Sequence, residues 1–204
     1  MSSKFTISVC VIASLLPFTA ESRDTSVLDV GLQVQSCVFR FKDALDGSVN
    51  RPSEENNFEW AGYSATVKVS GEEESFGFNF SCHSNFSDIN EVATDYGCYF
   101  NSEQNKWLPA FPGASPDEVS RLRKVTKTFP LTSKNGHGFY MIQDETVGEP
   151  DRRVRHISYC LFHETKAICG LGEVKRLVDA KSDMLPYALR ILRSVEFLDI
   201  RRNQ

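Results

Sequence analysis

The clearest structural signal in the chain lies between Arg155 and Phe197, which read RHISYCLFHETKAICGLGEVKRLVDAKSDMLPYALRILRSVEF. Apolar runs on both sides of Glu164-Thr165 predict two antiparallel strands joined by a turn. A linker follows, and then an amphipathic helix capped by Ser182 or Asp183, with its leucines spaced to share one face. A last strand is expected over Val195–Ile200.

The turn at Glu164-Thr165 fixes the register of these two strands. Folding about it places Phe162 opposite Ala167 and Cys160 opposite Cys169. With a tight turn, the cysteines occupy a non-hydrogen-bonded pair, where antiparallel strands approach most closely and a cross-strand disulfide fits. The sequence therefore predicts a disulfide between Cys160 and Cys169.

The N-terminus has the layout of a secretory signal. One positive charge in Met1–Lys4 precedes an apolar run over Phe5–Leu16, then Pro17 and the small residues of Ala20-Glu21-Ser22. The apolar run is about 12 residues, whereas a membrane-spanning helix needs about 20. We expect residues 1–22 to be removed and the product to reach the periplasm or the exterior. A short anchor or a buried strand is the alternative.

Charge and length limit the classes of function. The 204 residues include 23 Lys and Arg against 27 Asp and Glu, for a formal net charge of −4. This balance does not favour nucleic-acid binding, which uses a concentrated basic face. Residues 23–204 have the length of a single domain with a proper core.

Five cysteines remain after removal of the signal: Cys37, Cys82, Cys98, Cys160 and Cys169. Their spacing fits no zinc pattern, and disulfides are the default in an exported protein. Besides Cys160–Cys169, we predict a Cys82–Cys98 disulfide that closes a polar loop, leaving Cys37 free and buried in a strand. A Cys37–Cys82 or Cys37–Cys98 disulfide is the alternative.

The rest of the sequence predicts further strands and one further helix. Leu32–Phe41 is predicted as one strand with a bulge, because the parity of its apolar residues shifts midway. Phe58–Val69 and Ser75–Cys82 alternate as a strand pair around an acidic turn. Ser115 and Glu118 form a capping box for a helix ending near Lys124. The predicted fold class is α+β: an antiparallel β-sheet, stabilised by disulfides, with two helices packed on one face.

No stretch carries a recognisable catalytic, metal or cofactor motif. The chain lacks G-x-S-x-G, and its four histidines, His83, His137, His156 and His163, are scattered. Gly170-Leu171-Gly172 lacks the third glycine of a phosphate-binding loop, so we interpret it as a strand end or bulge. We therefore expect a non-enzymatic protein without cofactor or metal. Two triplets, beginning at Asn79 and Asn85, match the N-glycosylation pattern.

Three loops are candidate protein-binding surfaces. The acidic tip of Glu72, Glu73 and Glu74 could enter a basic cleft of a partner, or it could be a solvated turn. Trp107 and Phe111, in a proline-rich loop, could anchor a partner or close the end of the core. His137 lies between glycines and is the histidine expected to be most available.

The C-terminal region resembles that of small exported bacterial proteins. The likeness is carried by Tyr159-Cys160-Leu161, by Ala167–Gly172 and by Ile191–Phe197. Some proteins of this kind are periplasmic immunity proteins against type VI secretion effectors, and others are envelope proteins. The resemblance implies an exported α+β binding protein, without cofactor, that occludes the active site of a toxin. It transfers no binding residue. A secreted hydrolase with an unrecognised acid/base pair and a ligand-binding or structural envelope protein are the alternatives.

Overall fold

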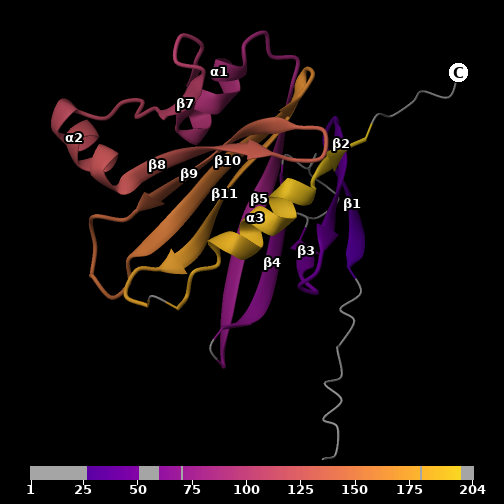
Figure 1. Ribbon diagram of the computed structural model, residues 1–204, viewed down its shortest axis with the longest axis horizontal. Coiled ribbons are helices and arrows are strands. Elements are labelled where there is room, and N and C mark those ends of the chain that lie inside the picture. The colour runs from indigo at the N-terminus through magenta and orange to yellow at the C-terminus, as the bar shows by residue number, and fades with distance from the viewer. Residues whose placement is uncertain (1–26, 51–59, 70, 180, 199–204) are drawn as a thin grey trace, which may run out of the picture.

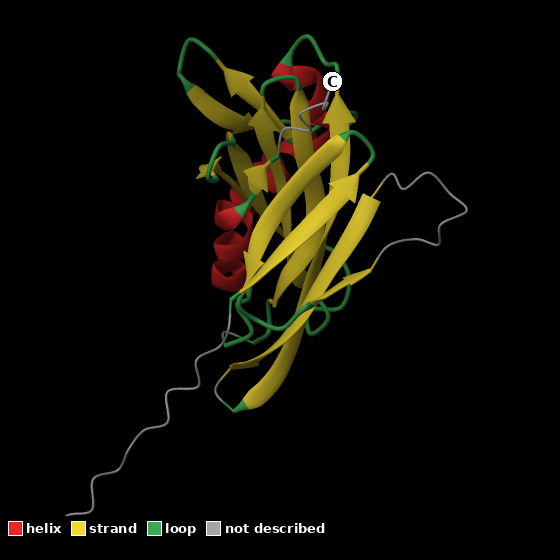
Figure 2. Ribbon diagram, turned by 90° about the vertical axis from the view of Figure 1, so that its right-hand side faces the viewer, coloured by secondary structure: helices red, strands yellow, loops and turns green. Residues whose placement is uncertain are grey.

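The structure is a computed structural model that describes residues 27–50, 60–69, 71–179 and 181–198. The predicted signal peptide, residues 1–22, lies outside this part. Of the described residues, 53% are in strands and 17% are helical. The protein is therefore mostly β, with three short α-helices, and the predicted α+β class is wrong. Figures 1 and 2 show strands dominating both views.

Three antiparallel sheets contain the described strands. The largest has seven, in the order β3 (Ser48–Asn50), β4 (Trp60–Val69), β5 (Glu72–Ser84), β11 (Lys166–Arg176), β10 (Val154–His163), β9 (His137–Asp144) and β8 (Thr126–Thr132). A second sheet has the order β1 (Leu28–Val34), β2 (Cys37–Asp43) and β12 (Glu196–Phe197). The third pairs β6 (Cys98–Asn101) with β7 (Lys106–Pro109).

The helices are divided between the two faces of the large sheet. They are α1 (Ile89–Ala93), the 3-10 helix η1 (Thr94–Tyr96), α2 (Pro116–Val125) and α3 (Leu185–Ser194). α3 packs with the three-stranded sheet on one face, and α1 packs on the other. α2 has the predicted capping box but contributes no fully buried residue. The predicted pair of helices packed on one face is wrong, because α3 buries four residues against the fold whereas α2 buries none. No helix in the described ranges is long and apolar enough to cross a membrane.

Each face of the large sheet covers its own core. The main core lies under α3 and the three-stranded sheet, where Phe39 and Phe41 contact Phe80 at centroid distances of 5.2 and 5.5 Å. The second core lies under α1 and β6–β7 and includes Phe139 and Phe162. Because the sheet is buried from both sides, its central strands need apolar residues at successive positions, not at alternate ones.

The predicted register of the last hairpin is confirmed. Cys160 pairs with Cys169 and Phe162 with Ala167, about a turn at Glu164-Thr165. The two cysteines form a disulfide with their Cα atoms 4.0 Å apart. This is the close approach expected of a non-hydrogen-bonded pair. The disulfide points into the second core, beneath α1.

The segment Leu32–Phe41 is two strands and not one bulged strand. A two-residue turn at Gln35-Ser36, with Gln35 at φ 49°, folds β2 back along β1. The parity shift that suggested a bulge is the reversal at this turn. Because Leu32 and Val34 pair with Phe39 and Cys37, both strands present their apolar residues to the main core.

The second disulfide joins Cys37 to Cys82, with Cα atoms 5.7 Å apart. The predicted Cys82–Cys98 pair is therefore wrong, and the alternative pairing through Cys37 is the one that forms. The physical reason is that Cys82 faces the main core, toward β2, whereas Cys98 belongs to the second core on the other face. Among the five cysteines of the described residues, Cys98 is a buried free thiol.

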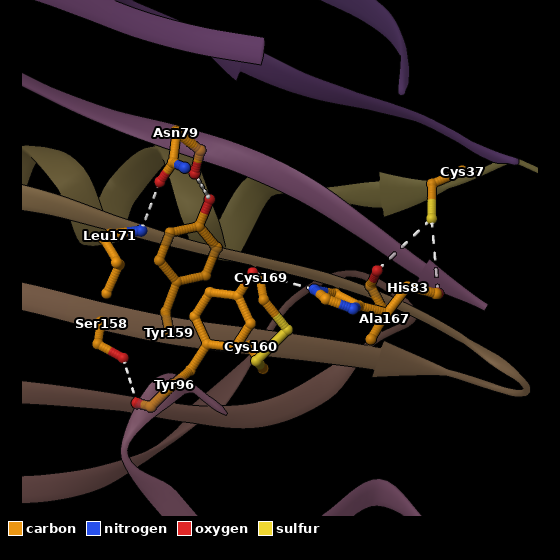
Figure 3. Close-up of a disulfide and its surroundings, with 10 residues drawn as sticks. All are labelled: Cys37, Asn79, His83, Tyr96, Ser158, Tyr159, Cys160, Ala167, Cys169 and Leu171. Atoms are coloured by element: carbon orange, nitrogen blue, oxygen red, sulfur yellow. Dashed lines mark hydrogen bonds between the residues drawn. A yellow bond between two sulfur atoms is a disulfide. The ribbon is translucent and has the colours of Figure 1, made fainter. Parts of the chain in front are cut away.

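The close contact between β5 and β11 explains why β11 contains two glycines, in Gly170-Leu171-Gly172. The buried Tyr159 hydroxyl donates to the Asn79 carbonyl at 2.7 Å, and the Leu171 N–H donates to Asn79 Oδ1 at 2.6 Å (Figure 3). A Cβ on Gly170 would lie 1.8 Å from the Asn79 carbonyl oxygen. These glycines allow close strand contact inside β11, and not at its end.

Peptide mapping under non-reducing conditions should recover Cys37 joined to Cys82 and Cys160 joined to Cys169. Cys98 is 0% exposed, and burial raises its pKa to about 12. Because thiolates are the reactive form, a maleimide at pH 7 should leave Cys98 unlabelled until denaturant is added. Recovery of a Cys82–Cys98 peptide, or rapid labelling of Cys98 in the native protein, would contradict the arrangement.

Removing the Tyr159 hydroxyl should destabilise the sheet. Tyr159→Phe leaves the Asn79 carbonyl without this donor, so we expect a loss of about 1–2 kcal/mol in the free energy of unfolding. Urea denaturation measures it. Tyr140→Phe is the matched control, because the Tyr140 hydroxyl makes no hydrogen bond to any described residue and this tyrosine stacks on Phe129. Equal effects of the two changes would argue against the Tyr159–Asn79 bond.

Candidate protein-binding surface

The second face of the large sheet is only partly covered. We call the covering elements α1, η1, β6 and β7 (Ile89–Pro109) the cap. The cap is attached by the Ser158 hydroxyl, which donates to the Tyr96 carbonyl (Figure 3). It is also attached by the Thr128 hydroxyl, which donates to the Trp107 carbonyl at 3.0 Å. These contacts end at the level of Ser158. Beyond it on this face, Glu173 is exposed and His156 and Gln143 are partly exposed, whereas Thr126 is buried.

A row of polar residues crosses the uncovered part. Residues directly opposite one another on neighbouring strands share a face, so successive pairings define the row. It runs through Ser48, Ser64, Gly77, Glu173, His156, Gln143 and Thr126, one from each strand in sheet order. We call this row, together with Trp60, Asn79 and Leu171 beside it, the open face.

Two large apolar side chains stand out on the open face. Trp60, at the start of β4, is 45% exposed, and Leu171, in β11, is 53% exposed. The Trp60 ring lies beside Gly62, where an added Cβ would be 3.3 Å from Cζ3 of the indole. Gly62 pairs with Asn79, and Asn79 bonds to Leu171, so the two apolar residues flank Asn79. Exposed tryptophan among polar residues is typical of an interface anchor.

His156 gives the open face its main charged contact. Its Nε2 lies 2.9 Å from Glu145 Oε1, and both side chains are more than one-third exposed. The other oxygen of Glu145 accepts from the Val154 N–H at 3.1 Å. The His156 bond, followed by the Val154 bond, lowers the pKa of Glu145. The carboxylate is therefore kept ionised and held beside the imidazole.

A carboxylate that orients an imidazole is two-thirds of a nucleophilic catalytic set. The third member must lie within hydrogen-bond reach of His156. Thr126 lies two strands away, about 10 Å at the usual strand spacing, and its hydroxyl accepts from the Gln143 amide at 2.9 Å. Ser64 lies three strands away, about 14 Å. The Ser158 hydroxyl is used by the Tyr96 carbonyl. The His156–Glu145 pair can therefore hydrogen-bond a bound molecule. Within the described ranges, no hydroxyl nucleophile lies beside His156.

The predicted acidic tip is part of a strand, and two of its three glutamates contact a basic side chain. Glu73 lies 3.9 Å from Lys68, which is directly opposite in β4. Glu74 has a side chain only 12% exposed and contacts Arg176 at 2.7 Å. Glu72 is exposed, and its carboxylate gathers with those of Glu74 and Asp179 within 4.8 Å. The tip therefore presents less negative charge than its three glutamates suggest.

The other predicted binding residues lie apart from one another. Trp107 is half-buried in the second core, with its ring parallel to that of Phe162 and a centroid distance of 4.7 Å to Phe139. These contacts fit the alternative that Trp107 closes the core. Phe111 is half-buried in the loop before α2, and His137 is exposed at the start of β9. The structure thus does not bring the predicted residues together into one site.

A shallow hollow lies next to α2. It has a volume of about 400 Å³ and is lined by Ala114, Leu122 and Val147 together with Glu118 and Arg121. Val147 is 73% exposed, so the hollow opens broadly to solvent. It lies against α2, which contributes no fully buried residue.

Sequence reasoning missed Trp60, Leu171 and His156. A signal for Trp60 was present: it shares its parity with Gly62 and Ser64, whereas Ala61 and Tyr63 are apolar and buried. Strict alternation predicts that a tryptophan in the polar set faces solvent. His156 could not be found this way, because its partner Glu145 becomes a neighbour only through the pairing of β9 with β10.

Comparison with known proteins adds no relative. No family model matches the chain, and none of the curated proteins is significantly similar to it.

The ion pair next to Glu145 should produce a pH-dependent stability. Arg155 holds Asp144 through two hydrogen bonds of 2.5 and 2.8 Å, with both side chains about one-quarter exposed. These bonds lower the pKa of Asp144. A lowered carboxyl pKa stabilises the fold above the unfolded pKa of about 3.9, and the contribution disappears as pH falls through the folded pKa.

We therefore expect Asp144→Asn to lose about 1 kcal/mol of unfolding free energy at pH 7 and progressively less as pH approaches 2. Urea denaturation of both proteins across this range measures the difference. Asp151→Asn, at an exposed turn residue, is the control. A loss that stays constant between pH 7 and pH 2 would show that the ion pair is not its cause.

Proposed function

We propose that this protein is an exported, non-enzymatic binding protein that holds a protein partner on its open face. The observation that carries the proposal is the exposure of Trp60 and Leu171 on an uncovered sheet face bordered by polar side chains. Hot spots at protein interfaces are enriched in tryptophan, surrounded by polar contacts that exclude water. The open face has both parts of this arrangement.

The scaffold supports binding because it is preorganised. The open face belongs to strands that are buried on their other side. The Cys160–Cys169 disulfide links β10 to β11, and the Cys37–Cys82 disulfide ties β5 to the small sheet. A partner would therefore meet side chains that are already positioned, which lowers the entropy lost on binding. Two disulfides are also compatible with a periplasmic or extracellular location.

The partner we propose is a secreted toxin, so that the protein acts as a periplasmic immunity protein. Support comes from the resemblance of the C-terminal region to exported bacterial proteins that include such immunity proteins, and from the signal-like N-terminus. In this mechanism the open face covers the toxin's active site and blocks its substrate. Trp60 provides the apolar anchor, and the His156–Glu145 pair supplies hydrogen bonds.

An affinity pull-down of residues 23–204 from the native host is the first experiment. Recovery of one stoichiometric toxin, whose activity falls when this protein is added, would support the proposal. The purified pair then allows the surface to be located by calorimetry. Trp60→Ala should weaken binding at least tenfold, since a central tryptophan contributes about 2 kcal/mol or more.

Two variants serve as matched controls. Val178→Ala changes an apolar residue that is 64% exposed and outside the open face, so its affinity should equal that of the wild type. Glu72→Lys with Glu73→Lys tests the acidic tip and should also leave binding intact. Loss of binding in the double lysine variant, with normal binding by Trp60→Ala, would move the interface to the tip and refute the open face.

A further inference from the structure

The strand β1 forms one edge of the three-stranded sheet, at the margin of the fold beyond β2 (Figure 1). Within the part of the chain that is described, its one strand partner is β2. It is seven residues long and has one charged residue, Asp29, but no lysine or proline, so it has few of the features that prevent an edge from pairing with another chain. Val27 and Leu28, at its start, are each 52% exposed.

The hairpin geometry shows which backbone groups face outward. Val34 and Cys37 flank the two-residue turn and therefore form a hydrogen-bonded pair. Alternate residues of β1 bond to β2 from there, so Asp29, Gly31 and Gln33 direct their N–H and C=O groups away from it. These three residues are exposed, and apart from the two chain neighbours no atom of the described residues lies within 4 Å of a Cβ placed on Gly31.

The sequence of β1, Leu-Asp-Val-Gly-Leu-Gln-Val, is nearly symmetric about Gly31. If a second copy pairs antiparallel about a two-fold axis at Gly31, Leu28 faces Val34 and Val30 faces Leu32 of that copy. Asp29 faces Gln33, so an acceptor meets an amide donor. Each pairing is repeated by the symmetry, as an isologous interface requires.

The same register separates the charges. Asp29 is the one ionisable residue of β1, and the two copies of Asp29 lie four residue steps apart, about 13 Å along the strand. Gln33 now donates to the carbonyl of Gln35 at 3.2 Å, and its amide has a second N–H for Asp29. Leu28 would lie opposite Val34 of the second copy. Val34 is 1% exposed, because it belongs to the main core of its own chain.

We propose that β1 pairs with β1 of a second copy, joining two three-stranded sheets into one six-stranded sheet across a two-fold axis at Gly31. This inference concerns the three-stranded sheet and does not rest on the proposed function. Pairing would satisfy six outward backbone groups per chain and cover Leu28.

Sedimentation velocity of residues 23–204 over about 1–500 µM tests the proposal, because mass action makes dimerisation concentration-dependent. The wild type should pass from monomer to dimer. Gly31→Pro removes one outward N–H group. Proline is tolerated at this position of an edge strand, because the lost N–H does not bond to β2. It should raise the dimer dissociation constant at least tenfold. Gly31→Ala keeps that N–H and should dimerise like the wild type.

A charge exchange tests the register. Gln33→Asp places an aspartate opposite Asp29 twice and should weaken the dimer, whereas Asp29→Gln combined with Gln33→Asp restores an acid opposite an amide and should recover it. Circular dichroism and the Cys37–Cys82 peptide verify folding of each variant. A wild type that stays monomeric at the highest concentration would overturn the proposal. The edge of β1 would then be a candidate for pairing with a strand of another protein. Unchanged dimerisation by Gly31→Pro would also refute pairing through β1.

Discussion

Two-sided burial of the β10–β11 hairpin is the constraint on which the other layers depend. Ile157, Tyr159 and Leu161 face the main core, while Cys160 and Phe162 face the second core, and all five are at most 2% exposed. Such strands must be covered on both faces, since exposing either set would cost roughly 1.5–3 kcal/mol for each large side chain. α3 with the small sheet covers one set, and the cap covers the other.

Local patterns made the hairpin and one helix predictable. A turn at Glu164-Thr165 fixes every pair of β10–β11 because the side-chain period of a strand is two. Ser115 and Glu118 likewise define the start of α2 within four residues. In both cases the interacting groups are close in sequence, so the physical reason for the structure is contained in a short window. The Cys160–Cys169 pairing shares this locality.

The remaining errors depend mostly on contacts between distant segments. The parity shift in Leu32–Phe41 fits either a bulge or a hairpin, and only the β2–β5 packing that joins Cys37 to Cys82 distinguishes them. The face chosen by each helix depends in the same way on sheet order. The candidate site was hidden for a related reason: Leu171 becomes a neighbour of Asn79 through strands whose residues are 92 positions apart, and no short window contains it together with Trp60.

The partial coverage of the second face has a further consequence for how the protein could act. The open face lies on the seven-stranded sheet, whereas β1 belongs to the small sheet packed against the opposite face. Pairing through β1 would therefore leave both open faces of a dimer accessible. Two identical surfaces on one rigid particle can bind an oligomeric partner twice, and the second contact then forms at high effective concentration. A modest interface around Trp60 would suffice for tight binding to such a partner.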